Sequence, residues 1–349
     1  PNPGPGQLPG GPANGDPFNG APPQGTFPGP GTGNPGTGSP GTTAQSSATA
    51  QQAAGIVDIN TVVGYQHAQA AGTGLVLTGS GQILTNNHVI MGATKIVVTV
   101  ITTGNSYAAT VVGTSPTKDI AVLQLAGASG LTPAALGDSA TVSVGAAVTG
   151  VGNAGGVGGV PSAAQGSVAA LNKTITVSDK GGGNSETLNG LIVTTAPIQP
   201  GDSGGPLYNA SNKVIGIDTA AATSPSNGTT SAGFAIPINS ALSLAKQITT
   251  KQASATIHLG YPAFLGVGFS PNATSATVGL VYPSSPAAQA GLVAGDTITA
   301  VDGTAIADTA TLHDAITAHQ PGDSVTLTWT DAAGASHTAT VSLIAGPAD

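Results

Sequence analysis

The chain has 349 residues, with seven Lys, no Arg, 14 Asp and one Glu, and its formal net charge at pH 7 is −8. This acidic balance argues against electrostatic capture of nucleic acid or anionic lipid. The absence of Cys excludes disulfides, zinc–thiolate sites and thiol nucleophiles. No apolar run approaches the ~20 residues of a membrane span. Because the chain opens at Pro1 without Met, we expect a removed signal peptide or membrane anchor before it.

Residues 1–53 consist mainly of Pro, Gly, Asn, Thr, Ser, Gln and Ala. Such a segment cannot bury enough apolar area to offset the entropy lost on ordering. We therefore predict a disordered, partly extended spacer. A role as a tether or as a partner-binding arm is the alternative.

Residues 54–251 contain short β-branched runs separated by Gly, Asn and Ser. Runs on either side of Thr78-Gly79-Ser80-Gly81 and of Thr102-Thr103-Gly104-Asn105 predict two β-hairpins. This spacing, with almost no helical periodicity, predicts an all-β barrel or sandwich. The first convincing helix is predicted at 239–251, with Asn239 or Ser240 as its N-cap. Further strands are expected at 119–125, 140–149, 165–171, 191–194, 213–218 and 233–238.

Residues 252–261 are interpreted as a linker, and residues 262–349 as a separate α+β unit. Ser285-Pro286 to Gly291 predicts a short helix with Pro near its start and Gly at its end. Asp302-Gly303 predicts a tight turn, and residues 309–319 an amphipathic helix. Strands are expected at 263–269, 278–281, 296–301, 324–329 and 337–343.

The stretch Gly201-Asp202-Ser203-Gly204-Gly205-Pro206 holds the strongest catalytic signal. A serine hydroxyl becomes a useful nucleophile when a base takes its proton and fixed donors receive the oxyanion. Ser203 supplies the hydroxyl. The backbone N–H groups of Gly201 and Ser203 can converge on one oxygen. The alternative is an ordinary Gly-rich turn.

The partners that this chemistry needs lie upstream of Ser203. His88, in Thr85-Asn86-Asn87-His88-Val89-Ile90, is the candidate base, and Asp119, before a short apolar run, is the candidate orienting acid. Taken alone, each fits an ordinary surface histidine or strand-capping acid. The order His, Asp, Ser across an all-β region is the chymotrypsin-type arrangement.

These three blocks resemble those of trypsin-like serine proteases, and more narrowly those of the HtrA (DegP-like) family, over roughly residues 56–345. The resemblance implies two six-stranded β-barrels with an active site between them. It implies that His88 accepts the Ser203 proton, that Asp119 orients His88, and that Gly201 and Ser203 form the oxyanion hole. It also implies that no cofactor is needed. The sequence departs from the family at Asp202, where HtrA proteins usually carry Asn, so a buried Asp202 must find hydrogen-bond donors.

The same resemblance places the primary specificity pocket. Its base falls at Pro197, which is no acid, so cleavage after Lys or Arg is disfavoured. The small residues expected to line the pocket favour cleavage after a small or medium aliphatic residue. These lining residues are Thr219, Ala220, Ala221 and Ala235.

The C-terminal unit resembles a PDZ domain. Residues 263–267, read as Ala-Phe-Leu-Gly-Val, resemble the carboxylate-binding loop of such domains. A peptide C-terminus would add as a strand beside this loop, and successive N–H groups would hold its carboxylate. The predicted contacts are Phe264, Leu265, Gly266, Val267, Leu312 and Ile316. The alternative is a small α+β domain that binds no ligand.

The leading interpretation is an exported bacterial serine endopeptidase that acts on unfolded or damaged envelope proteins, either secreted or attached to the cell envelope. The alternative is a chaperone-like peptide-binding protein in which proteolysis is minor. HtrA proteins commonly trimerise through the N-terminal part of the protease. The corresponding region here, before Ile56, has few aromatic residues, so a homotrimer is left open. His313 and His319 lack the spacing of metal ligands on one helix face, and no metal site is predicted.

Overall fold

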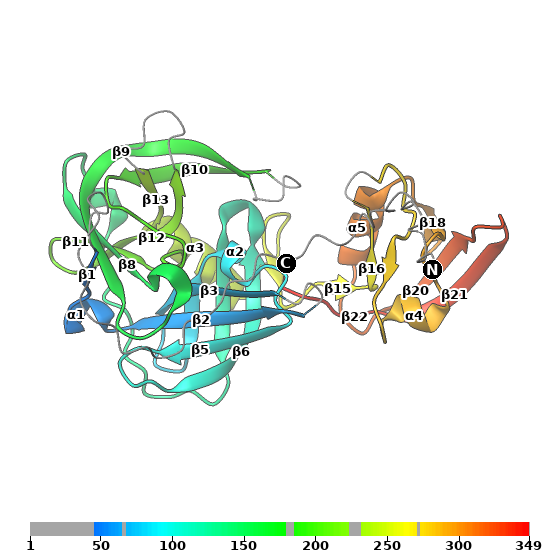
Figure 1. Ribbon diagram of the computed structural model, residues 1–349, viewed down its shortest axis with the longest axis horizontal. Helices are drawn as coiled ribbons and strands as arrows, with labels where there is room; N and C mark the ends of the chain where they lie inside the picture. Colours follow the sequence, from blue (N-terminus) through cyan, green and yellow to red (C-terminus); the bar gives the residue numbers. More distant parts are fainter. Residues whose placement is uncertain (1–44, 65–67, 179–184, 223–231, 271–272, 349) are drawn as a thin grey trace, which may run out of the picture. The chain divides into compact units, whose positions relative to one another are not determined.

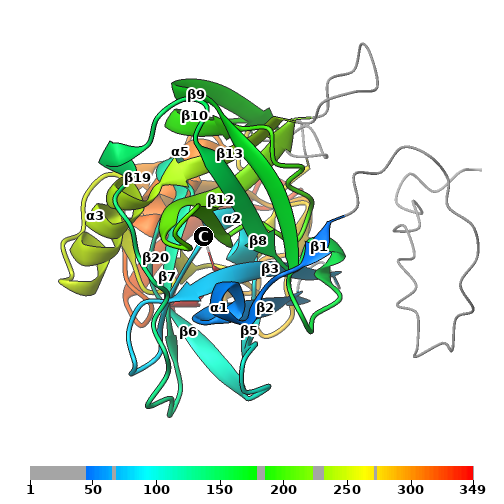
Figure 2. The same cartoon turned by 90° about the vertical axis from the view of Figure 1, so that its left-hand side faces the viewer.

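The computed structural model describes residues 45–64, 68–178, 185–222, 232–270 and 273–348. Most of the predicted spacer therefore lies outside the described residues. Its last part does not behave as a spacer, because Ser46–Ser47 forms strand β1 and Ala50–Ala53 forms helix α1. Strand β1 pairs with a strand of the second barrel, as can be followed in Figure 2. The prediction was wrong here because it rested on the polar composition of the segment, whereas the strand that pairs with β1 is more than 100 residues away in the sequence.

The first sheet closes into a six-stranded antiparallel barrel (Figure 1). Its strand order is β6-β5-β2-β3-β4-β7, and β7 pairs back onto β6. The predicted hairpins at 78–81 and 102–105 are both confirmed, as the β3–β4 and β5–β6 connections. The linker adds β14 to the outside of β6. The bounds are β2 Ile56–Val63, β3 Ala68–Val76, β4 Gln82–Thr85, β5 Lys95–Val100, β6 Ser106–Ser115, β7 Ile120–Leu125 and β14 His258–Leu259.

The second sheet closes in the same way, in the order β9-β10-β13-β12-β11-β8, and β8 pairs back onto β9. The expectation of two six-stranded barrels is thus confirmed. The strand predicted at 140–149 exists but its predicted start was wrong, because residues 139–141 form a 3₁₀ turn and the strand begins only at Ala147. The bounds are β8 Ala147–Gly152, β9 Ser162–Ser178, β10 Ser185–Thr194, β11 Pro206–Asn209, β12 Val214–Ala222 and β13 Ala232–Pro237.

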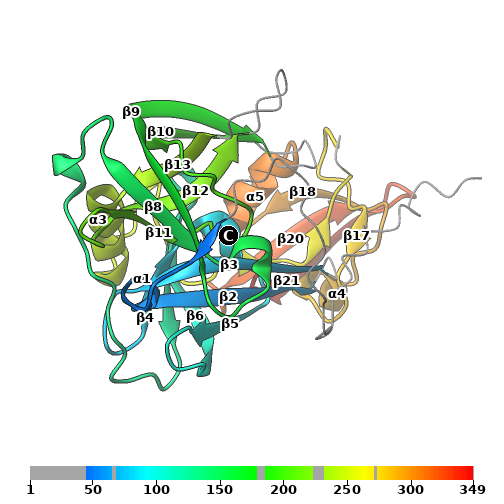
Figure 3. The same cartoon turned by 60° about the vertical axis from the view of Figure 1, so that its left-hand side comes forward.

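Helix α3, Ile238–Thr249, follows β13 directly and is visible beside the second-barrel strands in Figure 3. Its buried residues, among them Ala241 and Ala245, recur at helical spacing and pack into the main core. The prediction of Asn239 or Ser240 as N-cap was wrong. Pro237 is the N-cap, and the Asn239 side chain instead donates to Asp138 (2.7 Å).

The C-terminal unit has its own apolar core and small sheets. Helix α4 begins after Ser285, whose hydroxyl accepts from Ala288 N–H, and ends at Gly291 with φ of 89°. Asp302 and Gly303 join β18 and β19 with φ angles of 49° and 77°, so the predicted tight turn is confirmed. The bounds are β15 Ala263–Phe264, β16 Val267–Gly268, β17 Leu280–Val281, α4 Pro286–Ala290, β18 Thr297–Val301, β19 Thr304–Ala305, α5 Thr309–Thr317, β20 Ser324–Thr330, β21 Ser336–Ser342 and β22 Ile344–Ala345.

Within the described residues, no helix is both long and apolar enough to cross a membrane. The same residues contain no group of three His, Asp or Glu side chains arranged to hold a metal ion.

Candidate active site

Ser203 lies on a sharp turn between β10 and β11, and the turn depends on two glycines. Gly201 and Gly204 have φ angles of 99° and 85°, in the left-handed region that side chains disfavour. A Cβ on Gly201 would lie 2.1 Å from the Asn153 carbonyl oxygen. A Cβ on Gly204 would lie 2.0 Å from the Thr73 carbonyl oxygen. Only glycine therefore fits at either position.

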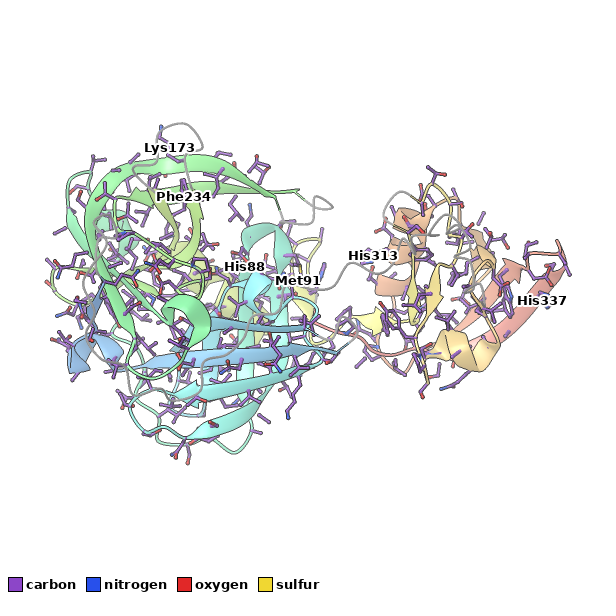
Figure 4. All side chains as sticks on the ribbon, viewed as in Figure 1. His88, Met91, Lys173, Phe234, His313 and His337 are labelled. Carbon is purple, nitrogen blue, oxygen red and sulfur yellow. The ribbon has the colours of Figure 1, made fainter. Side chains whose placement is uncertain are left out.

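The candidate base and acid are joined directly. His88 lies on the short helix α2, Asn87–Ile90, and is labelled with nearby Met91 in Figure 4. Its Nδ1 atom is 2.9 Å from Asp119 Oδ2, and its backbone N–H donates to Asp119 Oδ1 (3.0 Å). Asp119 is buried, and its carbonyl accepts from the Asn86 side chain (2.8 Å). The carboxylate is thus fixed against one ring nitrogen of an imidazole whose side chain is 38% exposed.

Thr219 links this pair to Ser203. The Thr219 hydroxyl donates to Asp119 Oδ2, and the Thr219 carbonyl accepts from the Ser203 hydroxyl (3.2 Å). We had expected Thr219 only as a wall of the specificity pocket. Its position directly after Asp218 in the sequence gave no sign of a bridge to Asp119, which lies 100 residues away.

The turn before Ser203 is held in a conformation suited to an oxyanion hole. The Pro200 carbonyl accepts from Gly155 N–H (2.8 Å). Because the peptide group is planar and trans, the Gly201 N–H points away from that bond. Thr73 supports the turn: its hydroxyl donates to the Gly201 carbonyl (2.7 Å), and its N–H donates to the Ser203 carbonyl (2.8 Å). Among the described residues, no acceptor is bonded to the N–H of Gly201 or Ser203.

Asp202, where this sequence departs from the family pattern, is 1% exposed, and its carboxylate accepts hydrogen bonds from several groups. Gln199 N–H donates to its Oδ2 (2.9 Å), the Ser162 hydroxyl lies 3.4 Å from its Oδ1, and the Gln45 side chain also hydrogen-bonds to it. Burial nevertheless raises the pKa of Asp202 above its usual range. The Gln45 amide also donates to the Pro197 carbonyl (2.9 Å).

The other predicted pocket residues lie on the turn before Ser203 and on strands β12 and β13. Pro197 is half-buried on the turn before Ser203. Ala220 and Ala221 continue β12 and pair with Phe234 and Gly233 of β13. Ala235 is fully buried in an apolar cluster of the second barrel and pairs with Asp218 of β12, directly before Thr219.

The C-terminal unit contains a groove of about 350 Å³. Gly266, at φ of 87°, lies so close to Ser285 that a Cβ there would be 2.1 Å from the Ser285 Cβ. Asp308 caps α5 through Thr311 N–H (2.7 Å) and fixes the start of the helix that forms one side. Phe269 and His313, which the sequence analysis missed, also line the groove. All six residues proposed from the sequence lie along it: Phe264, Leu265, Gly266, Val267, Leu312 and Ile316.

Comparison with known proteins gives two family matches. Residues 72–217 match the trypsin-like peptidase domain, and residues 263–342 match the PDZ domain. The double barrel with its serine turn, followed by a grooved α+β unit, thus defines a trypsin-like peptidase carrying a PDZ domain.

Individual relatives narrow this class. The chain is 34% identical to serine protease PepD of Mycobacterium tuberculosis over 303 residues, covering 82% of this chain and 63% of the relative. It is 36% identical to the periplasmic pH-dependent serine endoprotease DegQ of Escherichia coli over 269 residues, covering 74% of this chain and 56% of the relative. The chain therefore spans less than two thirds of the length of these relatives.

Among solved structures, the HtrA-type protease AlgW with tripeptide matches with a TM-score of 0.50 and 28% identity, covering 85% of this chain and 95% of that chain. The protein belongs to the HtrA (DegP-like) family of trypsin-like serine proteases with a C-terminal PDZ domain.

Proposed function

We propose that the protein is a serine endopeptidase in which His88, Asp119 and Ser203 form the catalytic triad. The observation that carries this proposal is the hydrogen-bonded chain from His88 through Asp119 and Thr219 to Ser203. The family membership supports the same reaction class.

In the proposed reaction, Ser203 Oγ attacks the scissile carbonyl carbon and passes its proton to His88. The tetrahedral oxyanion accepts from the N–H groups of Gly201 and Ser203, and one such donor is worth about 3–4 kcal/mol of barrier. His88 then protonates the leaving amine, which leaves an acyl-enzyme. Water, deprotonated by His88, hydrolyses this ester and restores the Ser203 hydroxyl. Asp119 holds the imidazole in its reactive tautomer and stabilises its cation.

Replacing Ser203 tests this assignment. We expect Ser203→Ala to abolish peptide-bond cleavage and labelling by a fluorophosphonate, with unchanged circular dichroism and Tm. Mass spectrometry of the labelled wild-type chain should map the adduct to Ser203. Undiminished cleavage by the purified variant, with contaminating protease excluded, would overturn the proposal.

We further propose that the PDZ groove binds the C-termini of peptides with an apolar last residue. The support is the apolar lining of the groove and the left-handed Gly266, which lets the loop approach Ser285 at the start of α4 closely. A solved relative, AlgW, is described with a tripeptide. A fluorescent peptide ending in Val should bind, and the same peptide with a C-terminal amide should bind at least about tenfold more weakly, because the carboxylate is removed. Equal affinity of the two peptides would contradict the mode.

We propose unfolded exported proteins as substrates and a location outside the cytoplasm, because relatives such as DegQ are named as periplasmic. Turnover of unfolded casein should be lost after treatment with a serine-directed phosphonate. If the treated protein still suppressed casein aggregation fully and the untreated protein cleaved little, the chaperone-like alternative would hold instead.

A further inference from the structure

A second buried carboxyl group belongs to a residue whose backbone is hydrogen-bonded to the Ser203 turn, and the proposed reaction does not use this group. Asp218 is 0% exposed, and neither of its carboxyl oxygens has a hydrogen-bond partner among the described residues. Its backbone, on strand β12, is hydrogen-bonded to the serine turn: its carbonyl accepts from Gly204 N–H (2.8 Å), and its N–H donates to the Gly205 carbonyl (2.8 Å). The next residue, Thr219, accepts from the Ser203 hydroxyl.

The carboxyl groups of Asp218 and Asp202 pack against two glycines, Gly150 and Gly152, on one face of strand β8. A Cβ on Gly150 would lie 2.9 Å from Asp218 Oδ2, and a Cβ on Gly152 would lie 2.8 Å from Asp202 Oδ1. Residues two apart on a strand share a face and lie roughly 7 Å from one another. The two glycines therefore leave room for two carboxyl groups at close range.

Within the part of the chain that the structure describes, no Lys side chain is buried beside this pair. The chain has no Arg, and every Lys in the described residues is exposed, including Lys173 on β9 (Figure 4) and Lys246 on α3. Of the elements packed against Asp218, β8 and β13 carry no titratable residue. Strand β11 carries Tyr208, whose hydroxyl donates to the Gln52 carbonyl (2.9 Å).

We propose that Asp218 and Asp202 share one negative charge at neutral pH, with the proton held on Asp218, and that the neutral Asp218 is a positioning residue for the 199–203 turn. The charge belongs on Asp202 because that carboxylate accepts from Gln199 N–H and from the side chains of Ser162 and Gln45. Asp218 has no such donors among the described residues, so its charged form would be buried without compensation.

Two like charges this close in a dry site cannot both form readily. Burial, followed by repulsion from Asp202, raises the pKa of Asp218 well above its usual range. Once Asp218 loses its proton at alkaline pH, repulsion acts on Asp202, which holds Gln199 N–H at the start of the turn. The Gly201 N–H then leaves the oxyanion position. This step rests on the proposed catalytic role of the turn, whereas the protonation of Asp218 does not.

The proton can be observed directly in the full chain. With aspartate labelled at the side-chain carboxyl carbon, ¹³C NMR of the Ser203→Ala protein at pH 7 should show one protonated carboxyl signal. The signal should disappear in Asp218→Asn on the same background and remain in the control Asp331→Asn, which removes an exposed carboxylate near His337. The absence of a protonated aspartate at pH 7, or its survival in Asp218→Asn, overturns the proposal even if the protein proves not to be a protease.

The positioning role predicts a pH profile. The amide of Asp218→Asn has the shape of the neutral acid and cannot ionise, so kcat/KM near pH 7 should stay within about threefold of the wild type. The alkaline fall in kcat/KM should move up by at least one pH unit or vanish. Superimposable wild-type and Asp218→Asn profiles overturn the role. If the variant does not fold, the NMR spectrum of the Ser203→Ala protein alone still decides whether Asp218 holds the proton.

Discussion

At the scale of single residues, Thr219 carries an interaction that the triad motifs do not contain. Its hydroxyl contacts the buried oxygen of Asp119, and its carbonyl contacts the hydroxyl of Ser203. A hydrogen bond to a charged group contributes about 1.5–3 kcal/mol. The loss of this bond should therefore reduce the orienting effect of Asp119 on His88.

We expect Thr219→Val to lower kcat by about 10- to 100-fold, because each ~1.4 kcal/mol lost from transition-state stabilisation costs about tenfold. The KM for a short peptide should change little. Thr219→Ser keeps the hydroxyl and is the matched control, with at least about a third of wild-type kcat expected. Equal kcat values for the Val and Ser variants would show that the bond to Asp119 is dispensable.

A second residue-scale prediction concerns Asp58, on β2 in the first barrel. Burial raises the pKa of Asp58 from 3.8 to about 6, partly offset by a hydrogen bond from the Gly159 backbone. Between these two pKa values the folded protein binds more protons than the unfolded chain. The contribution of Asp58 to the free energy of unfolding therefore falls as pH rises from about 4 to about 6.

Asp58→Asn removes this contribution. The free energy of unfolding of the wild type, relative to the variant, should decrease as pH rises through that window and be constant above about pH 7. Urea unfolding of both proteins at half-unit pH intervals measures the difference. A difference independent of pH would mean that Asp58 titrates alike in the folded and unfolded states.

At the scale of elements, the serine turn depends on backbone conformations that exclude side chains. In Gly204→Ala, the new Cβ meets the Thr73 carbonyl oxygen at a backbone φ of 85°, and neither group can move without shifting β3 or the turn. We expect a loss in kcat/KM of more than about tenfold together with a lower Tm. The matched control is Gly104→Ala, where φ is 70° but nothing lies within 4 Å of the new Cβ.

Gly104→Ala should cost only the strain of the left-handed backbone, about 1–2 kcal/mol, and should leave kcat/KM unchanged. The comparison thus separates backbone strain from the clash. If both variants had equal activity and equal Tm, close approach to Thr73 would not be what requires glycine at position 204.

Several elements differ from their predictions for an identifiable reason. Residues 140–146 have the β-branched composition of a strand, yet form a 3₁₀ turn and a loop before β8. The polar segment 46–53 becomes β1 and α1, because β9 offers an edge and Tyr208 donates to the Gln52 carbonyl. Hairpins were easier to predict, because their pairing is local and the Gly-rich turn marks it.

At the scale of the whole molecule, the apolar core of the PDZ unit contains no residue of the protease barrels. The residue that accepts a hydrogen bond from the Ser203 hydroxyl, Thr219, is not among the residues that line the PDZ groove. Ser203→Ala should therefore bind the Val-ending peptide with the Kd of the wild type, within about twofold, in fluorescence anisotropy. A Kd raised tenfold would reveal that the two sites communicate in the resting protein.

The sequence by itself determined the class of this protein: the three triad blocks, the glycines around Ser203, the hairpin turns and the groove residues are all local patterns with local physical causes. Tertiary structure decided the rest. The bond from Thr219 to Asp119 and the juxtaposition of Asp202 with Asp218 join residues that lie on different elements of the fold. A hydrogen bond or a buried charge depends on which atoms meet and on how completely water is excluded, and only the folding of both barrels fixes these two conditions.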